Sequence, residues 1–423
     1  MPGLALSRVG ARVFESDTLN NDGRDDQIWA RLEALPDPRS PQGLIYPLPC
    51  LVAAAVCALT AAGHDRLTAV GQWLKAASQT DLARLRMPRD PFTGVHRAPD
   101  EKTIRVVLDR LDPRALARAL LGPRRRRQVR GTGPDGSPSK RVRAYRARRA
   151  AAQRKVLARN RIRAVAVDGK TSRGARRKDG TRVHLLGVVD HRDGRLLDQL
   201  EVDVKHNETT HFTQLLAELD LTDVAVTFDA LNTVRANLDW LVVTKNAHYV
   251  AVVKKNQPLL YAKVKALPWK KIPTGATSRE MGHGRVETRS LKAVHVDQLR
   301  VDFPHVKQAV KVTRWRQDTR TGKISRETVY VVTSLSWAQA TPAALATLIR
   351  DHWGVEVHHH IRDISFGEDH ATSRTGHGPV NLATLRAMVI AAIKDAGYLY
   401  IPEGRRDHTR PIDALYLHAL IAS

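Results

Sequence analysis

The stretch that most constrains the fold runs from Arg163 to Gly174, RAVAVDGKTSRG, and places one acidic residue inside an apolar run. The alternation of alanine and valine is typical of a buried strand, because branched side chains pack well on a pleated sheet. Burying a charge there costs several kcal/mol unless a cation or hydrogen-bond donors compensate it. Asp168 therefore requires either a metal ion or a basic partner, and Lys170 and Arg173 are candidates for a local ion pair.

The pattern after this stretch predicts a sheet with helices between its later strands. Three β-type runs, VAVDG, VHLLGVVD and LLDQLEVDVK, are separated by the turn sequences KDG and HRDG, which are typical of hairpins. The helical runs THFTQLLAEL and ANLDWLVVTK then alternate with the strands VAVTFDA and HYVAVVK. The predicted order is βββαβαβ. If the first and fourth strands are neighbours, Asp168 and Asp229 can share a divalent cation.

A third acidic residue lies on a helix predicted further along the chain. The segment TPAALATLIRDHWGVEVHHHIRDISFGED begins with a Thr-Pro helix start and keeps helical apolar spacing. On one helix His352, Glu356, His360 and Asp363 recur at i, i+4, i+8 and i+11 and form one polar stripe. Such a stripe either faces solvent or lines a site, and in a site Glu356 supplies the third carboxylate.

Three carboxylates from a strand, a strand end and a helix would form an anionic site in an otherwise basic chain. Oxygen ligands suit Mg²⁺ or Mn²⁺, and two such ions about 3.5–4 Å apart activate a nucleophile and stabilise a leaving oxygen. We therefore predict that Asp168, Asp229 and Glu356 are the catalytic residues and hold two Mg²⁺ or Mn²⁺ ions for phosphoryl transfer on nucleic acid.

Basic residues are concentrated in one block of the sequence. The chain carries 69 Lys and Arg against 43 Asp and Glu, and its net charge of +26 favours polyanionic partners. Between Arg124 and Arg163 there are sixteen basic residues and one acidic residue, a net +15. A solvated linker is the alternative, but counterion release on a phosphate backbone suits such a block better. The candidate DNA contacts there are Arg124, Arg125, Arg126, Arg127, Arg146, Arg148 and Arg149.

Composition and periodicity divide the chain into four parts. Residues 1–26 are polar and aperiodic and are predicted to be a flexible leader. Residues 27–122 have helical spacing and are predicted to form an all-helical N-terminal DNA-binding domain, although a bundle that only packs on its neighbour is the alternative. Residues 123–162 form a basic connector interrupted by GTGPDGSPSK, and residues 163–423 form the predicted catalytic domain.

Zinc sites and membrane spans are both disfavoured. Cys50 and Cys57 lie in an apolar helical run and are predicted to pack in a core. The adjacent histidines His358, His359 and His360 point in different directions on a helix, which argues against zinc. The apolar run of residues 51–62 is too short to span a bilayer, so a cytoplasmic protein is expected.

Two further segments complete the predicted catalytic domain. Residues from about 259 to 340 are strand-like and rich in basic residues, and we predict a β-rich insertion there. The run from Asn381 to Gly397 is predicted to be an amphipathic helix that covers the sheet.

Motifs along most of the chain carry a family resemblance. They are LPDPRSPQGLIYPL, AVDGKTSRG, VKHNET, VTFDALNT, YVAVVKKNQP, GHGRVETR, and RDHWGVEVHHHIRDISFGED followed by SRTG. From about Leu35 to Gly397 the sequence resembles insertion-sequence transposases of the ISAs type, within the DDE group that shares the ribonuclease H-like fold. The resemblance assigns the catalytic acids to Asp168, Asp229 and Glu356, the same trio that the spacing predicts.

The sequence departs from related DDE families beside the predicted catalytic glutamate. Those families carry Tyr, Arg and Lys at places that hold Ile349, His352 and Asp363 here. A protonated His352 is one substitute for the missing phosphate contacts, and Arg350 or Arg362 are others. The further, weaker candidates for DNA or phosphate contact are Lys170, Lys254, Asn256 and His360.

The resemblance implies an α/β ribonuclease H-like mixed-sheet core and a DNA transposase activity. Such an enzyme binds the inverted-repeat ends of its element in double-stranded DNA, cleaves them and joins them to target DNA. It is expected to act as a homodimer or a higher oligomer, because two ends are synapsed, and to associate with the nucleoid. The alternatives are a nuclease or resolvase on the same fold, a domesticated and catalytically silent DNA-binding protein, and an RNA-binding protein.

Overall fold

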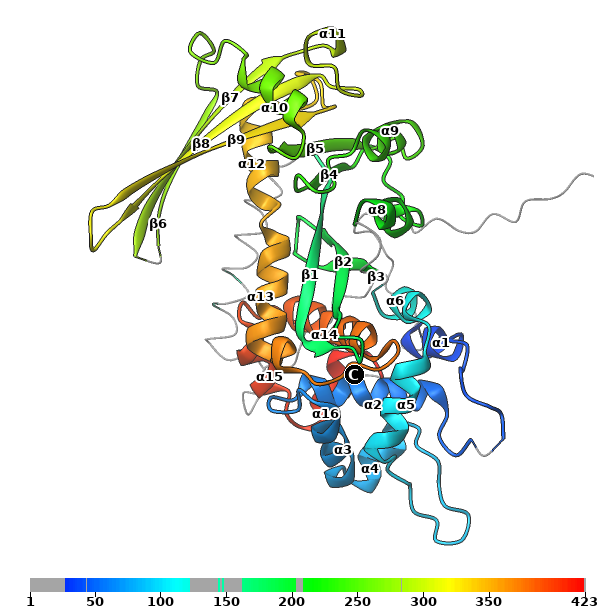
Figure 1. The fold of residues 1–423 in the computed structure, drawn as a ribbon. Helices are drawn as coiled ribbons and strands as arrows, with labels where there is room; N and C mark the ends of the chain where they lie inside the picture. Colours follow the sequence, from blue (N-terminus) through cyan, green and yellow to red (C-terminus); the bar gives the residue numbers. More distant parts are fainter. Residues whose placement is uncertain are drawn as a thin grey trace, which may run out of the picture. The chain divides into compact units, whose positions relative to one another are not determined.

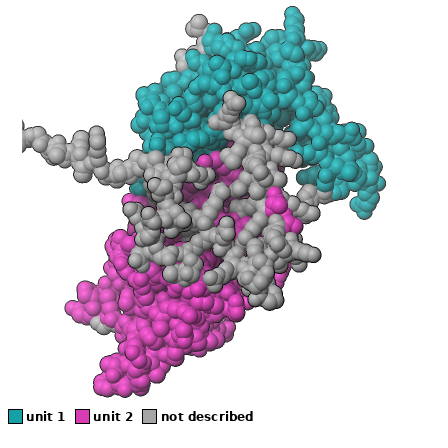
Figure 2. Space-filling model, turned by 180° about the vertical axis from the view of Figure 1, so that it is seen from behind, with its two compact units in different colours: residues 1–19, 162–167, 208–352 teal, residues 20–161, 168–207, 353–423 magenta. Residues whose placement is uncertain are grey.

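The structure is a computed structural model that describes residues 27–42, 44–121, 162–202, 208–282 and 284–421, with Ala144 and Ala147. The chain divides into two compact units, coloured separately in Figure 2. Unit 1 comprises Met1–Leu19, Ile162–Val167 and Glu208–His352, and unit 2 comprises Asn20–Arg161, Asp168–Asn207 and Trp353–Ser423. Each unit is described by itself.

Strand β1 (Ala164–Arg176) passes from one unit into the other, because its first four residues belong to unit 1 and the rest to unit 2. The described strands form a mixed sheet in the order β3-β2-β1-β4-β5-β9-β8-β7-β6. The order of elements from β1 to β5 is βββαβαβ, which confirms the predicted sequence of strands and helices. The fold is therefore of the mixed α/β class.

In unit 1, short parallel strands continue into a long antiparallel ribbon (Figure 1). The parallel pairs join β1 to β4 and β4 to β5, and β9 then pairs antiparallel with β5. The strands are β4 (Ala225–Phe228), β5 (His248–Val253), β6 (Ala276–Gly282), β7 (Arg285–His295), β8 (Gln308–Asp318) and β9 (Ile324–Thr333). Strands β6 to β9 lie within the segment for which a β-rich insertion was predicted.

Helices cover the sheet of unit 1. They are α8 (Glu208–Leu216), α9 (Arg235–Val243), α10 (Pro258–Lys265), α11 (Gln298–Val301) and α12 (Pro342–Asp351). Thr341 caps α12, since its side chain accepts a hydrogen bond from the Ala344 amide, as the Thr-Pro start predicts. Leu345 and Leu348 of this helix pack with Leu291 and Val310 in one buried apolar cluster.

Unit 2 is mostly helical. Its N-terminal helices are α1 (Gln27–Glu33), α2 (Leu48–Thr60), α3 (Leu67–Ala76), α4 (Gln79–Arg84), α5 (Glu101–Arg110) and α6 (Pro113–Leu121). Its strands, besides the end of β1, are β2 (Arg182–Asp190) and β3 (Leu196–Val202), which pair antiparallel. Its later helices are α13 (Gly354–Phe366), the 3₁₀ turn η1 (Glu368–His370), α14 (Gly378–Asp395), α15 (Ile401–Asp407) and α16 (Pro411–Leu417).

Helix α14 is the centre of unit 2, and the prediction of an amphipathic covering helix was wrong in one respect. It contacts β3, as a covering helix would, but α2, α5 and α6 pack against it as well, so most of its length is buried. Asn381 on α14 donates to the carbonyls of Leu108 at 2.7 Å and Leu111 at 2.8 Å. Burial of this amide is therefore compensated by hydrogen bonds to the end of α5.

Cys50 and Cys57 are free and buried, as predicted for core residues. Within the described residues, no helix is long and apolar enough to cross a membrane.

Candidate active site

The register of β1 and β4 fixes the backbone positions of the first two predicted acids. Val167 pairs with Phe228 in the last parallel pair of these strands. Asp168 and Asp229 each follow one residue later, at the carboxyl ends of the paired segments. Both residues are half-buried, in agreement with their place at the edge of an apolar layer.

The loop after β4 is fastened to β5, and this holds the backbone of Asp229. One Asp229 carboxylate oxygen, Oδ1, accepts a hydrogen bond from the Leu231 amide at 2.8 Å. The buried Thr233 hydroxyl lies 3.0 Å from the Asp229 carbonyl and 2.9 Å from the Val252 carbonyl. Asn256 Nδ2 donates to the Ala230 carbonyl at 2.6 Å. The structure therefore assigns Asn256 to this loop, not to the DNA contact that the sequence suggested.

His352, at the end of α12, lies beside β4 and stays uncharged. Its Nδ1 is 2.9 Å from the Thr227 hydroxyl, which also lies 3.2 Å from the Val165 carbonyl. Because the hydroxyl donates to the carbonyl, Nδ1–H is the donor in the histidine contact. Burial, helped by the charge of the exposed Lys254, lowers the pKa of His352 to about 4. The lowered pKa disfavours the protonated form of His352, and its predicted phosphate contact stays a prediction.

Glu356 lies in the first turn of α13 and is exposed. A carboxylate is stabilised at this end of a helix by the partial positive charge of the free amides. Among the described residues, no hydrogen bond or ion pair of the Glu356 side chain is found, so its oxygens remain available. His360, one turn further along, is exposed as well.

His359 is a residue of this region that the sequence did not single out. Its Nδ1 lies 3.7 Å from Oδ2 of Asp168. Burial, with the charges of Arg362 and Lys170, lowers the pKa of His359 to about 3, so the ring is neutral near pH 7. The only sequence signal was its place three residues after Glu356 on the same helix.

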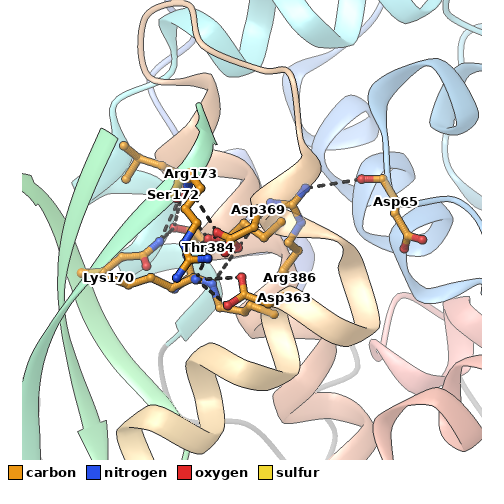
Figure 3. A network of polar contacts seen from close by, with 12 residues as sticks. Asp65, Lys170, Ser172, Arg173, Asp363, Asp369, Thr384 and Arg386 are labelled. Carbon is orange, nitrogen blue, oxygen red and sulfur yellow. Dashed lines mark hydrogen bonds and ion pairs between the residues drawn. The ribbon is translucent and has the colours of Figure 1, made fainter. Parts of the chain in front are cut away.

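Lys170 and Asp363 form a buried ion pair between β1 and α13 (Figure 3). Lys170 Nζ lies 2.7 and 2.8 Å from the two Asp363 oxygens, and 3.6 Å from Oδ1 of Asp369. Only 6% of the lysine side chain is exposed. Lys170 therefore already has carboxylate partners inside unit 2, and its predicted contact with DNA stays a prediction.

A second buried network of charged side chains lies next to this ion pair. Arg362 donates to both oxygens of Glu368 at 2.7 and 2.5 Å, and Arg386 donates to Glu368 at 3.3 Å. Burial raises the pKa of Glu368, but the two guanidinium groups outweigh it and lower the pKa to about 2. Ser172 of β1 donates to the same carboxylate at 3.2 Å. Arg362 is 1% exposed and pairs with Glu368, and its predicted phosphate contact stays a prediction.

The end of β1 lies so close to the turn after η1 that only glycine fits at position 174. A Cβ atom on Gly174 would lie 2.5 Å from the Ala371 carbonyl oxygen and 2.7 Å from that of Asp369. The glycine of the SRG motif therefore allows the close approach that the neighbouring ion pairs need.

The remaining predicted contacts are distributed as follows. Arg350 forms an ion pair with Glu280 of β6 at the surface of unit 1. Arg124, Arg125, Arg126, Arg127, Arg146, Arg148 and Arg149 lie outside the described residues.

In the described part of the chain, no group of three or more His, Cys, Asp or Glu side chains is close enough to hold a metal ion. The available donors are nevertheless of the kind that Mg²⁺ prefers. Glu356 is exposed and the carboxylates of Asp168 and Asp229 are half-exposed, and all are hard oxygen ligands.

Two protein-family models match this chain. The model of the family described as "Transposase DDE domain" matches residues 159–391, and that described as "DDE_Tnp_1-associated" matches residues 29–122. The first match alone covers more than half of the chain. The protein therefore belongs to the DDE transposase family.

Two bacterial relatives agree with this assignment. The transposase-like protein YncI of Escherichia coli O157:H7 is 26% identical over 275 residues, which cover 61% of this chain and 69% of YncI. The H repeat-associated transposase-like protein YhhI of Escherichia coli (strain K12) is 26% identical over 270 residues, 61% of this chain and 71% of YhhI. The piggyBac transposase, solved as a synaptic complex with hairpin DNA, matches with a TM-score of 0.37 and 11% identity, covering 87% of this chain and 80% of that one.

Proposed function

We propose that the protein is a Mg²⁺-dependent DNA transposase whose catalytic residues and metal ligands are Asp168, Asp229 and Glu356. The observation that carries the proposal is the β1–β4 register, in which one acid directly follows each of the two paired parallel segments, Ala164–Val167 and Ala225–Phe228. Glu356 supports it, because it is exposed on α13, and α13 is bound to β1 by the Lys170–Asp363 pair.

The proposed core is ribonuclease H-like, and the three acids would hold two divalent ions. Two bound ions lower the pKa of an attacking water or 3′ hydroxyl and neutralise charge on the leaving oxygen. The residues of the chain then have distinct tasks. Thr233 and Asn256 hold the loop that carries Asp229, and His359 presents an uncharged ring beside Asp168. A neutral ring does not compete with a cation for the carboxylate.

We also propose that the family's partner, double-stranded DNA carrying inverted-repeat ends, is the substrate here, and that two copies or more assemble on it. In this proposal the helical residues 27–122 and the connector 123–162 contribute to end binding, and residues 163–423 catalyse cleavage and strand transfer. The high net charge of +26 supports a polyanionic substrate.

The test is cleavage of a duplex that carries the inverted repeats flanking the gene. Asp168→Asn, Asp229→Asn and Glu356→Gln are each expected to abolish Mg²⁺-dependent cleavage and strand transfer while duplex binding persists. Asp413→Asn, which removes a surface acid paired with Arg410, is the matched control and is expected to cleave normally. Full cleavage by any one of the three variants would refute the assignment. Cleavage without joining by the unmodified protein would indicate a nuclease, and binding without cleavage a silent DNA-binding protein.

A further inference from the structure

The four strands β6 to β9 form a twisted ribbon within unit 1, which we call the β-arm (residues 276–333; Figure 1). Successive side chains on a strand point to opposite faces, so the strand register sorts the arm into two faces. All four acidic residues on its strands fall on one of these faces. The rows of this acidic face are Gly282–Arg285–Asp318, Glu280–Glu287–Arg316–Ser325 and Ser278–Arg289–Arg314–Glu327.

The acidic face neutralises its own arginines. Glu287, whose side chain is 8% exposed, contacts Arg289 and lies 3.0 Å from Arg314 and 3.4 Å from Arg316. Glu327 lies 3.4 Å from Arg314. These guanidinium groups already have carboxylate partners, so this face offers little charge to a polyanion.

The opposite, acid-free face has a different composition. Its rows are Met281–Val286–Gln317–Ile324, Arg279–Thr288–Trp315–Arg326 and Thr277–Ser290–Thr313–Thr328, and the next row along the arm contains Lys292 and Lys311. Arg279 and Arg326 are exposed, and within the described residues no carboxylate pairs with either. The Arg326 guanidinium lies 5.6 Å from the centre of the Trp315 ring.

We infer that the acid-free face of the β-arm docks on the sugar–phosphate backbone of duplex DNA. Arginine, lysine, serine and threonine side chains supply most backbone contacts in protein–DNA complexes. At the end of the arm, Met281 is 82% exposed and Ile324 is 62% exposed, which provides apolar surface for sugars or groove walls. The inference rests on the proposed function for the identity of the partner.

Charge complementarity favours DNA over a protein partner at this face. It presents unpaired cations beside the exposed hydroxyl groups of Thr277 and Thr328, and phosphate oxygens accept hydrogen bonds from both kinds of group. An acidic protein would pair with the cations, but it would not offer these hydroxyl groups a regular row of acceptors.

The first experiment compares the two faces by crosslinking in the full chain. Thr328→Cys places a thiol on the acid-free face, and Ser325→Cys places one on the acidic face of the same strand; both positions are exposed. Cys50 and Cys57 are buried and do not compete for a thiol-specific photocrosslinker. With a duplex carrying the flanking inverted repeats, we expect crosslinks from position 328 and only background from position 325. Equal crosslinking, or crosslinking from position 325 alone, would overturn the inference.

The second experiment measures how much the charges of Arg279 and Arg326 contribute to duplex affinity and to its salt dependence. Arg279→Gln combined with Arg326→Gln is expected to weaken duplex binding about tenfold. It is also expected to reduce the slope of log Kd against log salt by about two, since each lost phosphate contact contributes about 0.9. Lys270→Gln combined with Lys271→Gln is the matched control, because it removes the same charge from exposed residues of unit 1 outside the arm.

The two proposals fail in distinguishable ways. If both double variants bind alike while the unmodified chain still binds and cleaves, the arm inference is wrong and the transposase assignment stands. If the unmodified chain binds no duplex DNA, both are wrong.

Discussion

The ion pair between Lys170 and Asp363 is predicted to set the spacing of two proposed metal ligands. Asp168 and Lys170 are two residues apart on β1, so they share a face of the strand. Glu356 and Asp363 are two helical turns apart on α13, so they share a face of the helix. The pair at 2.7 Å therefore couples the strand that carries Asp168 to the helix that carries Glu356. Lys170→Met and Asp363→Asn are the perturbations that separate the roles of the two partners.

The two variants are expected to differ in stability. Breaking a buried pair costs about 3–5 kcal/mol when the remaining charge has no other partner. Lys170→Met should cost about 3 kcal/mol, because it leaves Asp363 without its cation and Asp369 with only the exposed Arg173 at 3.5 Å. Asp363→Asn should cost about 1–2 kcal/mol, because Asp363 is 27% exposed and Lys170 keeps Asp369 at 3.6 Å. Urea unfolding followed by tryptophan fluorescence gives the order of the two midpoints.

The functional readout is the Mg²⁺ concentration that gives half-maximal cleavage, together with direct binding of Mn²⁺ followed by electron spin resonance. Both variants are expected to need more metal, with duplex Kd unchanged, because their two ligands are held less firmly. Asp395→Asn is the control: it breaks a comparable pair, Arg195–Asp395 at 2.8 Å, that does not involve α13. It should lower stability and leave the metal requirement unchanged. A metal requirement that is unaltered in Lys170→Met, or equally altered in the control, would refute the reasoning.

Two other perturbations of unit 2 have predictable outcomes. The pKa of Glu368 is lowered in the folded protein to about 2, from an ordinary value of 4.5, so its contribution to stability is complete above about pH 4.5 and is lost as the pH falls toward 2. Acid unfolding should therefore steepen in this range, and Glu368→Gln should remove that dependence while lowering the urea midpoint at pH 7, because Arg362 and Arg386 lose their counter-charge. Gly174→Ala should cost about 1–3 kcal/mol, since its Cβ meets backbone oxygens, whereas Gly282→Ala, with open space around it, should change the midpoint little.

Local sequence patterns correctly predicted the structural elements whose formation depends on residues close together in the chain. The βββαβαβ order and the Thr341 cap were confirmed because alternation, turn residues and capping act over a few neighbours. The contacts that the sequence did not predict join residues that are distant in sequence. Lys170 and Asp363 are 193 positions apart, and nothing near either residue indicates that they meet. Helix α14 was expected to have a solvent face for the same reason, because the helices that cover it come from the start of the chain.

The departure beside Glu356 can now be explained in physical terms. Related families place Arg and Lys where this chain has His352 and Asp363, and the loss of two cations suggested lost phosphate contacts. In the structure neither position offers a charge to solvent: His352 is neutral and bonded to Thr227, and Asp363 is neutralised by Lys170. Both side chains fasten a helix to a strand. If this protein binds DNA phosphates tightly, cations at other positions must make the contacts. Among the described residues, the acid-free face of the β-arm carries two exposed arginines, Arg279 and Arg326, that pair with no carboxylate. The two proposals thus divide the charges of the chain: Lys170 and Asp363 pair internally beside the proposed site, and DNA binding is proposed for a surface whose arginines have no carboxylate partner among the described residues.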